Sequence, residues 1–467
     1  MPDRQWRVRP ALNIPKEGLW LGAGATSGDG IRLGTLAEVM SGALPTVWLA
    51  TGKEQVVAVV GKRGSGKTFT LGVIAEGFSA GAHSAVGRQI KPRGVLLFDP
   101  LDVYWTLRFP VGESDNAEAR RHYSLARSVG LTGTECAVSA WMPGGNRRET
   151  DPDWFQTLQL SVPEMTLEEW ELLLGNSDVF NTPLGQALAD VIELVRSTGY
   201  RRNGRDVAPV TRFNLEQLVD ATDADALLNN FHPETIRALR QRLSALSKTR
   251  LFSADGTEIK QLVRPGSVAV VLLGRLPQSY RVVVVAVLTR MLLRERSNTA
   301  FAEKRLALDP KITAHDRKVL QAALDNGIAR TVVMLDEAQA FLAPGTNNAA
   351  RNLFVQLVKE GRNIGLSAVL ATQQPSALDS RILSQVETFL AHQLVTESDI
   401  RAIRENLKSE LPESIQFGSR QLDISAFLRI LPPGYCLISA SDQNTPEHRC
   451  FVTSIRPRAT VHGGIEL

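Results

Sequence analysis

The feature that most constrains this chain is the segment GKRGSGKT at residues 61–68. It follows the apolar run QVVAVV and precedes a helical stretch, which predicts a phosphate-binding loop between a buried strand and a helix. Backbone amides at the start of such a helix surround a phosphate. Lys67 is expected to bridge the β- and γ-phosphates of ATP, and Thr68 to hold Mg²⁺. The predicted nucleotide-binding residues are Gly61, Gly64, Ser65, Gly66, Lys67 and Thr68.

The pattern from residue 55 onward predicts an α/β fold. Short apolar, β-branched runs are each followed by a turn and a helical period, as in a parallel sheet covered by helices. Their continuous hydrophobicity indicates that both faces of each strand are buried. Between residues 107 and 265 amphipathic helical patterns dominate instead, for example at 184–197 and 234–247. The predicted strands are 55–60, 94–99, 268–274, 331–336, 366–372 and 387–394.

A second motif is the apolar run TVVMLD at 331–336, which ends in the adjacent carboxylates Asp336 and Glu337. At the carboxyl end of a strand Asp336 can join the Mg²⁺ shell, and Glu337 can polarise an attacking water. A lone acidic pair after a strand is a weak signal, but it gains specificity beside a phosphate-binding loop. A glutamate at this place indicates an ATP hydrolase rather than a kinase.

A third constellation is Gly361-Arg362-Asn363, followed by the run LSAVLATQQPS. Gln373 falls at the end of the predicted strand, where its amide could contact both the γ-phosphate and the attacking water. Position alone leaves alternatives open. Gln373 could be an ordinary polar loop residue, and Arg362 could be a cation favoured at a helix C-terminus.

Composition excludes several classes of protein. The 53 basic and 49 acidic residues leave a net charge of +4, which permits polyanion binding but does not require it. Three widely spaced cysteines predict neither a disulfide framework nor a zinc site. The N-terminus has no secretory pattern, and the longest apolar stretch, residues 280–293, is interrupted by two arginines before reaching the about 18 residues of a membrane span. We therefore expect a cytoplasmic protein without membrane segments.

Four segments together resemble the HerA/FtsK superfamily of hexameric DNA-translocating ATPases, and within it the HerA branch. They are GKRGSGKT, TVVMLDEAQAFL, KEGRNIGLSAVLATQQPS and SQVETFLAHQL. The resemblance implies a RecA-like P-loop NTPase core with a mainly parallel sheet over residues 46–110 and 266–462. It also implies that Arg362 is an arginine finger reaching a neighbouring subunit's site and that Gln373 is the nucleotide sensor.

The chain departs from the family pattern in three places. Residues 1–45, interpreted as an N-terminal arm and short lead-in, are too few for the β-barrel that HerA proteins usually carry. The family's Asp-Pro-x-Gly-Glu-Tyr step is replaced by DPLDVY, in which only Asp99 and Tyr104 match the acidic and aromatic ends. Residues 111–265 form a mainly helical insertion that the resemblance does not describe, and residues 463–467 form a C-terminal tail.

In a ring motor the loops at the carboxyl ends of the strands line the pore, which points to residues 343–351 as a DNA contact. Asn347, Asn348 and Arg351 could bond phosphates without reading sequence. Two basic clusters are alternatives, each more simply explained as a solvated surface. They comprise Arg201, Arg202 and Arg205, and Lys304, Arg305, Lys311, Arg317 and Lys318.

The sequence as a whole predicts a Mg²⁺-dependent ATPase that forms a ring, a hexamer by the resemblance, and translocates DNA. A separately encoded nuclease or sirtuin-type effector is the expected partner, in DNA end processing or anti-phage defence. One alternative is a conjugation or secretion coupling ATPase. Another is an ATP-regulated scaffold that assembles and gates an effector enzyme, and weak stimulation by DNA would distinguish it from a motor.

Overall fold

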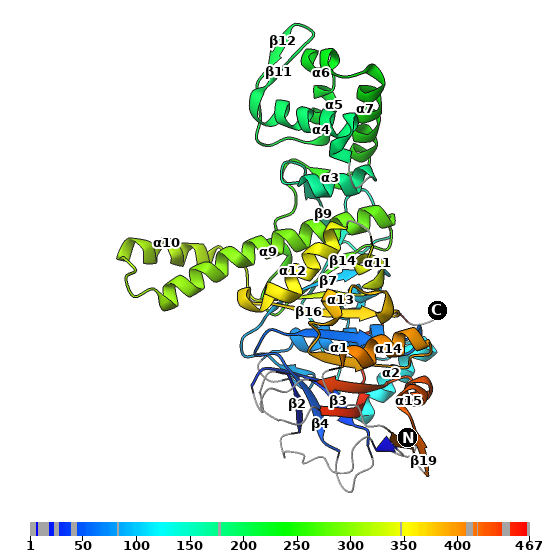
Figure 1. The fold of residues 1–467 in the computed structure, drawn as a ribbon. Coiled ribbons are helices and arrows are strands. Elements are labelled where there is room, and N and C mark those ends of the chain that lie inside the picture. Colours follow the sequence, from blue (N-terminus) through cyan, green and yellow to red (C-terminus); the bar gives the residue numbers. More distant parts are fainter. Residues whose placement is uncertain are drawn as a thin grey trace.

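A computed structural model describes residues 6–7, 18–22, 28–38, 44–81, 84–175, 179–345, 348–407, 414–417, 419–440 and 449–464. One long sheet runs through the molecule, with helices on both of its faces (Figure 1). Its central strands are all parallel. In spatial order they are β17 (Thr388–Ala391), β5 (Val56–Val60), β16 (Leu366–Thr372), β15 (Thr331–Leu335), β7 (Gly94–Asp99), β14 (Val268–Leu272), β8 (Val138–Pro143) and β9 (Gln156–Leu158).

The six predicted strands are all present in this parallel part, and they are apolar throughout because both faces are covered. Helix α1 (Lys67–Phe78) packs on the face to which Val57 and Val59 point. Helices α9 (Gln278–Leu308) and α12 (Ala349–Ile364) pack on the face to which Ala58 and Val60 point. Since the strands are parallel, their carboxyl ends meet at one edge of the sheet.

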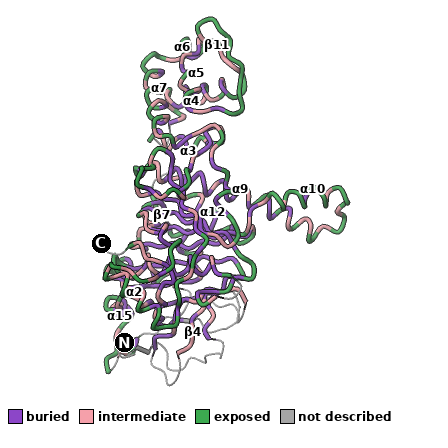
Figure 2. The backbone as a smooth tube through the Cα atoms, turned by 180° about the vertical axis from the view of Figure 1, so that it is seen from behind, coloured by how far each residue is buried: buried purple, intermediate pink, exposed green. Residues whose placement is uncertain are grey.

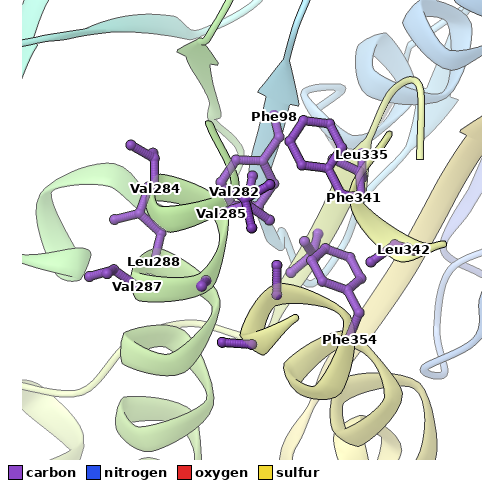
Figure 3. Close-up of a cluster of buried hydrophobic side chains, with 14 of the residues drawn as sticks. Phe98, Val282, Val284, Val285, Val287, Leu288, Leu335, Phe341, Leu342 and Phe354 are labelled. Atoms are coloured by element: carbon purple, nitrogen blue, oxygen red, sulfur yellow. The ribbon is translucent and has the colours of Figure 1, made fainter. Parts of the chain in front are cut away.

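The core under α9 and α12 is built from aliphatic and aromatic side chains. Figure 3 shows Val282 and Val285 of α9 beside Phe98 of the sheet, with phenylalanines of α12 and of the short helix α11 (Gln339–Leu342) close by. Burial on this scale stabilises by about 1.5–3 kcal/mol for each large side chain. The labelled residues of this cluster are Phe98, Val282, Val284, Val285, Val287, Leu288, Leu335, Phe341, Leu342 and Phe354.

The other half of the sheet is mostly antiparallel and includes strands from the span expected to be an N-terminal arm and lead-in. Leu19, Leu21, Ile31 and Leu33 are all buried in the apolar cluster that also contains Val57 and Val59, so the strands that carry these residues belong to the main core. Beyond β17 the order is β20 (Tyr435–Ala440), β21 (Arg449–Ile455), β3 (Gly30–Leu36), β4 (Thr46–Ala50) and β2 (Leu19–Leu21), with β6 (Gly87–Arg88) pairing with β3.

Residues 111–265 are not uniformly helical. Strands β8 and β9 lie in this span and extend the main sheet. The helical part stands beyond α9 as a separate group of helices with one β-hairpin at its far end (Figure 1). It comprises α3 (Leu167–Leu174), α4 (Pro183–Glu193), α5 (Leu215–Ala221), α6 (Asp225–Asn230), α7 (Pro233–Ser247), β11 (Tyr200–Arg202) and β12 (Arg205–Val207).

The end of α9 and helix α10 (Ala314–Asp325) project sideways from the sheet, and most of their residues are exposed (Figure 2). Among the described residues, no helix has both the length and the apolar character needed to cross a membrane. The remaining elements include α2 (Ala117–Ser128), α8 (Ile259–Leu262), α13 (Ser380–Leu383), α14 (Glu397–Asn406), α15 (Ile424–Ile430), β1 (Trp6–Arg7), β10 (Leu160–Ser161), β13 (Phe252–Ser253), β18 (Ile415–Phe417) and β19 (Arg420–Leu422).

Candidate nucleotide-binding site

The segment 61–68 forms a tight loop between β5 and α1. Gly66 caps α1 with a φ of 108°, a left-handed conformation that favours glycine. A Cβ on Gly61 would lie 2.5 Å from the Ser65 Oγ, so no side chain fits there. The carbonyl of Lys62 accepts hydrogen bonds from Ser65 Oγ at 2.7 Å and from Lys67 Nζ at 3.0 Å. The loop is thus closed around backbone amides, as phosphate binding requires.

Lys67 places its ammonium group inside this loop, where only 4% of the residue is exposed. Burial lowers the pKa of Lys67, and the nearby carboxylates of Glu337 and Asp336 oppose that shift. The carboxylates favour the charged form of Lys67, and a partly desolvated ammonium attracts a phosphate more strongly than an ammonium in water does.

Asp336 follows β15 at the same edge of the sheet and is fully buried. Its Oδ2 accepts hydrogen bonds from the Tyr104 hydroxyl at 2.7 Å and from Thr68 Oγ1 at 3.5 Å. Burial raises the pKa of Asp336, and the hydrogen bond from Tyr104 opposes that shift. The hydroxyl of Thr68 and the carboxylate of Asp336 are oxygen ligands of the kind that Mg²⁺ prefers, so the two residues fit the predicted metal site.

Asp99, at the end of the neighbouring strand β7, holds Tyr104 in place. Its carboxylate accepts hydrogen bonds from the backbone N–H groups of Tyr104 at 2.7 Å and Leu101 at 3.1 Å. Burial raises the pKa of Asp99 to about 8. The two residues of DPLDVY that match the family pattern are therefore linked. Asp99 orients the turn that carries Tyr104, and Tyr104 contacts Asp336.

Glu337 lies next to Asp336 and is held by two glutamine amides. Its Oε1 accepts from Gln373 Nε2 and its Oε2 from Gln339 Nε2, both at 2.5 Å. Gln339 in turn accepts a hydrogen bond from Thr372 Oγ1 at 2.7 Å. The backbone of Glu337 has a φ of 49°, a strained conformation for a residue with a Cβ. The structure thus brings Glu337 and Gln373 together and adds Gln339 between them.

Arg362 is not part of this constellation. It lies in the last turn of α12, and β16 must then run its full seven residues before the chain reaches Gln373. At about 3.3 Å per residue this separates Arg362 from its own Gln373 by about 20 Å, at the opposite edge of the sheet. Its side chain is 49% exposed and pairs with Glu387 at 3.8 Å.

In the described part of the segment predicted to contact DNA, Arg351 and Asn348 make internal contacts, and the DNA contact itself stays a prediction. Arg351 is only 12% exposed at its side chain, pairs with Asp379 at 3.6 Å and donates to the Ala343 carbonyl at 3.4 Å. Asn348 caps α12 and also donates to the Phe341 carbonyl. Asn347 lies outside the described residues.

His392, which the sequence analysis did not single out, packs against the loop at Gly61 and against helix α1 at Thr70. It is fully buried at the end of β17, and a Cβ on Gly61 would lie 2.7 Å from its Cβ. Its Nδ1 donates to the Tyr435 carbonyl at 2.9 Å, so its Nε2 accepts from Thr70 Oγ1 at 2.9 Å. Burial lowers the pKa of His392 to about 4, with a smaller contribution from Lys67. The only indication of His392 in the sequence is that a polar residue ends the apolar run TFLAH.

These features agree with a comparison to protein families. A model described as "Helicase HerA, central domain" matches residues 53–292, just over half of the chain. The chain belongs to this family. The matched span includes residues 111–265, which the sequence analysis placed outside the resemblance. It ends before Asp336, so the carboxylates at that strand end are supported by the geometry above and not by this match.

Individual relatives in the HerA family are distant. The DNA double-strand break repair helicase HerA of Sulfurisphaera tokodaii is 27% identical over 124 residues, 25% of each chain. The helicase of the same name from Pyrococcus furiosus is 24% identical over 190 residues, 39% of this chain and 34% of that one. The matches thus span about a third or less of these relatives.

A solved structure, VirB4 of Thermoanaerobacter pseudethanolicus, covers 92% of this chain and 98% of its own with a TM-score of 0.50 and 16% identity. At that identity the likeness shows a shared fold and nothing further. The shared fold agrees with the predicted α/β class and its mainly parallel sheet.

Proposed function

We propose that this HerA-family chain hydrolyses ATP with Mg²⁺ at the edge of the sheet where the loop 61–68 and Asp336 meet. The observation that carries the proposal is the Glu337 carboxylate, held by the Gln373 and Gln339 amides beside Lys67. A carboxylate fixed next to a phosphate-binding ammonium can accept a proton from a water that attacks the γ-phosphate.

Each side chain then has a definite part in the reaction. Lys67 and the loop amides bind the β- and γ-phosphates. Thr68 and Asp336 would hold Mg²⁺, which would supply charge neutralisation at the phosphate oxygens. Glu337 orients and deprotonates the water. Gln373 donates a hydrogen bond to Glu337, and a γ-phosphate oxygen could take that amide as its own donor, which would make the Glu337–Gln373 bond sensitive to the bound nucleotide.

The first experiment separates binding from hydrolysis. Glu337→Gln should retain ATP but lose turnover, because it keeps the shape and removes the base. Lys67→Ala should weaken both. Glu405→Gln, an exposed glutamate on α14, is the matched control and should behave as the unmodified protein. Nucleotide binding and phosphate release are the two measurements. Unchanged turnover in Glu337→Gln would show that Glu337 is not the base.

The position of Arg362 supports assembly into a closed ring, which we propose to be a hexamer. An arginine at the edge opposite its own site can serve only another copy of the chain, and head-to-tail packing that closes supplies such a copy at every site. Mass measurement with ATP and Mg²⁺ should therefore show a closed oligomer. A monomer with full ATPase activity would contradict the ring.

We further propose that the ring moves along DNA in the cytoplasm, with a separately encoded nuclease or sirtuin-type effector as its partner. Because Arg351 is engaged internally, the exposed basic side chains of the projecting α9–α10 hairpin, Lys304, Lys311, Arg317 and Lys318, are the better candidates for phosphate contact. Stimulation of ATPase activity by DNA of any sequence, falling steeply with salt, would support the motor. Stable assembly with an effector and no stimulation by DNA would favour the scaffold instead.

A further inference from the structure

Three aromatic rings gather beside the start of α1 and have no part in the reaction described above. Phe69 directly follows Thr68, His122 lies on α2, and His462 lies near the C-terminus. The ring centroid of Phe69 is 5.6 Å from that of His122 and 5.4 Å from that of His462, and both pairs of rings have an edge-to-face geometry. The two imidazoles are 5.9 Å apart. All three residues are partly exposed, so the group forms a small aromatic surface open to solvent.

The segment that carries His462, residues 456–464, is fixed along α1 and is called the strap below. Glu76 of α1 is fully buried and accepts hydrogen bonds from Arg456 at 2.7 Å and Arg458 at 3.2 Å. Gly72 leaves room for this contact, since a Cβ there would lie 2.7 Å from the Arg458 guanidinium. Val461 is anchored at its carbonyl by Thr106 Oγ1 at 2.9 Å. The aromatic surface is therefore preorganised and does not depend on a mobile end.

The contact between His462 and Arg458 also determines which ring nitrogen of His462 carries the proton. Arg458 Nη1 is 3.1 Å from His462 Nδ1 and can only donate, so Nδ1 accepts and Nε2 carries the proton. Burial lowers the pKa of His462 to about 3, with Arg458 and His122 adding to the shift. Burial also lowers the pKa of His122, against the opposing effect of Glu118. Both shifts favour neutral imidazoles at this surface, and in His462 the N–H is at Nε2.

We propose that Phe69, His122 and His462 receive the purine base of the nucleotide whose phosphates occupy the loop 61–68. This inference rests on the proposed ATPase function and extends it to base recognition. The phosphates are bound at the first amides of α1, and Phe69 lies one residue beyond Thr68 in the same turn, so the base can reach its ring across one ribose. Aromatic faces stack on bases, and the His462 Nε2–H can donate to a purine ring nitrogen.

The alternative is that the three rings only pack the strap and α2 against α1. The two interpretations predict different effects on the affinity for a ligand that has phosphates but no base. Inorganic tripolyphosphate with Mg²⁺ occupies the same loop as ATP but cannot touch the aromatic surface. Its affinity reports the condition of the loop and of α1, while the ratio of the two affinities reports base recognition.

The experiment compares ATP and tripolyphosphate binding in the full-length protein and in Phe69→Ala. Stacking of a base on one aromatic ring contributes enough that ATP affinity should fall roughly 5- to 150-fold, with tripolyphosphate affinity unchanged. Phe69→Trp should restore ATP binding. Tyr123→Ala, which removes the ring next to His122 on α2, is the matched control and should change neither affinity.

Equal losses for both ligands in Phe69→Ala, or no loss for either, would overturn the proposal. If that variant misfolds, His122→Ala serves in its place, because His122 lies on α2 and not on the helix that follows the loop 61–68. The unmodified protein should also prefer ATP and GTP over CTP, and His122→Ala should reduce that preference. Failure of the unmodified protein to bind either ATP or tripolyphosphate would refute the ATPase function itself, a distinct outcome.

Discussion

Replacing Arg362 by alanine is expected to abolish ATP hydrolysis while leaving ATP binding intact. Arg362 is separated along the backbone from its own Gln373 by strand β16, whose seven residues at about 3.3 Å each span about 20 Å. It therefore cannot reach its own γ-phosphate, and its effect must be exerted on a neighbouring subunit. Arginine fingers raise turnover by about 10³-fold or more, because they neutralise charge at the transferring phosphoryl group.

Mixed rings measure this directly. Arg362→Ala subunits keep Lys67 and lack the finger, while Lys67→Ala subunits keep the finger and lack a working site. In a head-to-tail ring assembled at random from equal amounts of both, about one interface in four joins an intact Lys67 to an intact Arg362. Turnover should therefore recover to about a quarter of the unmodified rate per subunit, from two parents that are each nearly inactive.

Two control variants test whether the loss of activity in Arg362→Ala is specific to the Arg362 guanidinium. Lys359→Ala removes an exposed cation one turn earlier on α12 and should leave turnover unchanged. Glu387→Gln removes the ion pair of Arg362 but keeps the guanidinium, so hydrolysis should persist. If rings shown by mass to contain both variants stayed as inactive as either parent, Arg362 would not act between subunits, and its position would reflect only a favourable charge at a helix C-terminus.

Three further changes test the structure elsewhere. Glu76→Gln should lower the free energy of unfolding near pH 7 by roughly 3–5 kcal/mol by leaving Arg456 and Arg458 without a counter-charge. The pKa of Glu76 is lowered in the folded protein, so its contribution is complete above about pH 4.5 and lost at lower pH; denaturation curves of the variant should lack that loss. The pKa of His392 is about 4 in the folded protein, against an ordinary value of 6.5. Between these pH values the unfolded chain binds one more proton than the folded chain, so the free energy of unfolding falls as the pH drops from 6.5 to 4. His392→Gln should make the free energy of unfolding less dependent on pH in this range. Arg351→Ala should lower stability by about 1–2 kcal/mol without changing DNA affinity at any salt concentration, and weaker DNA binding by a fully stable variant would show that Arg351 does face DNA.

The parallel half of the sheet could be predicted from sequence because its strands are buried on both faces and therefore apolar throughout. The antiparallel half could not. Strand β3 is interrupted by the partly exposed polar residues Arg32 and Thr35, and its partner β21 lies more than four hundred residues away, with Gly34 opposite Ile455. The valines of α9 favour strands by propensity, yet they form a helix because that helix is buried against the sheet.

The candidate site divides in the same way. Lys67, Asp336 and Glu337 could be predicted because each belongs to a local motif at the end of a strand. Gln339 and His392 could not be, because their roles depend on contacts that only the folded sheet creates. The ion pair between Arg351 and Asp379 could not be predicted either, since the sequence gives no sign that the two side chains lie 3.6 Å apart.

The helix that begins at Lys67 is held by parts of the chain that are remote in sequence. Below it, His392 accepts a hydrogen bond from Thr70, and above it Glu76 binds the strap across 380 residues of chain. A helix fixed on both sides cannot shift at its first turn without disturbing one of these contacts. Because Lys67 and Thr68 occupy that first turn, changes in the strap should alter nucleotide affinity even though the strap carries none of the phosphate-binding residues. Gly72→Ala provides a small perturbation of this kind, since the added methyl group would lie 2.7 Å from the Arg458 guanidinium and displace it from Glu76.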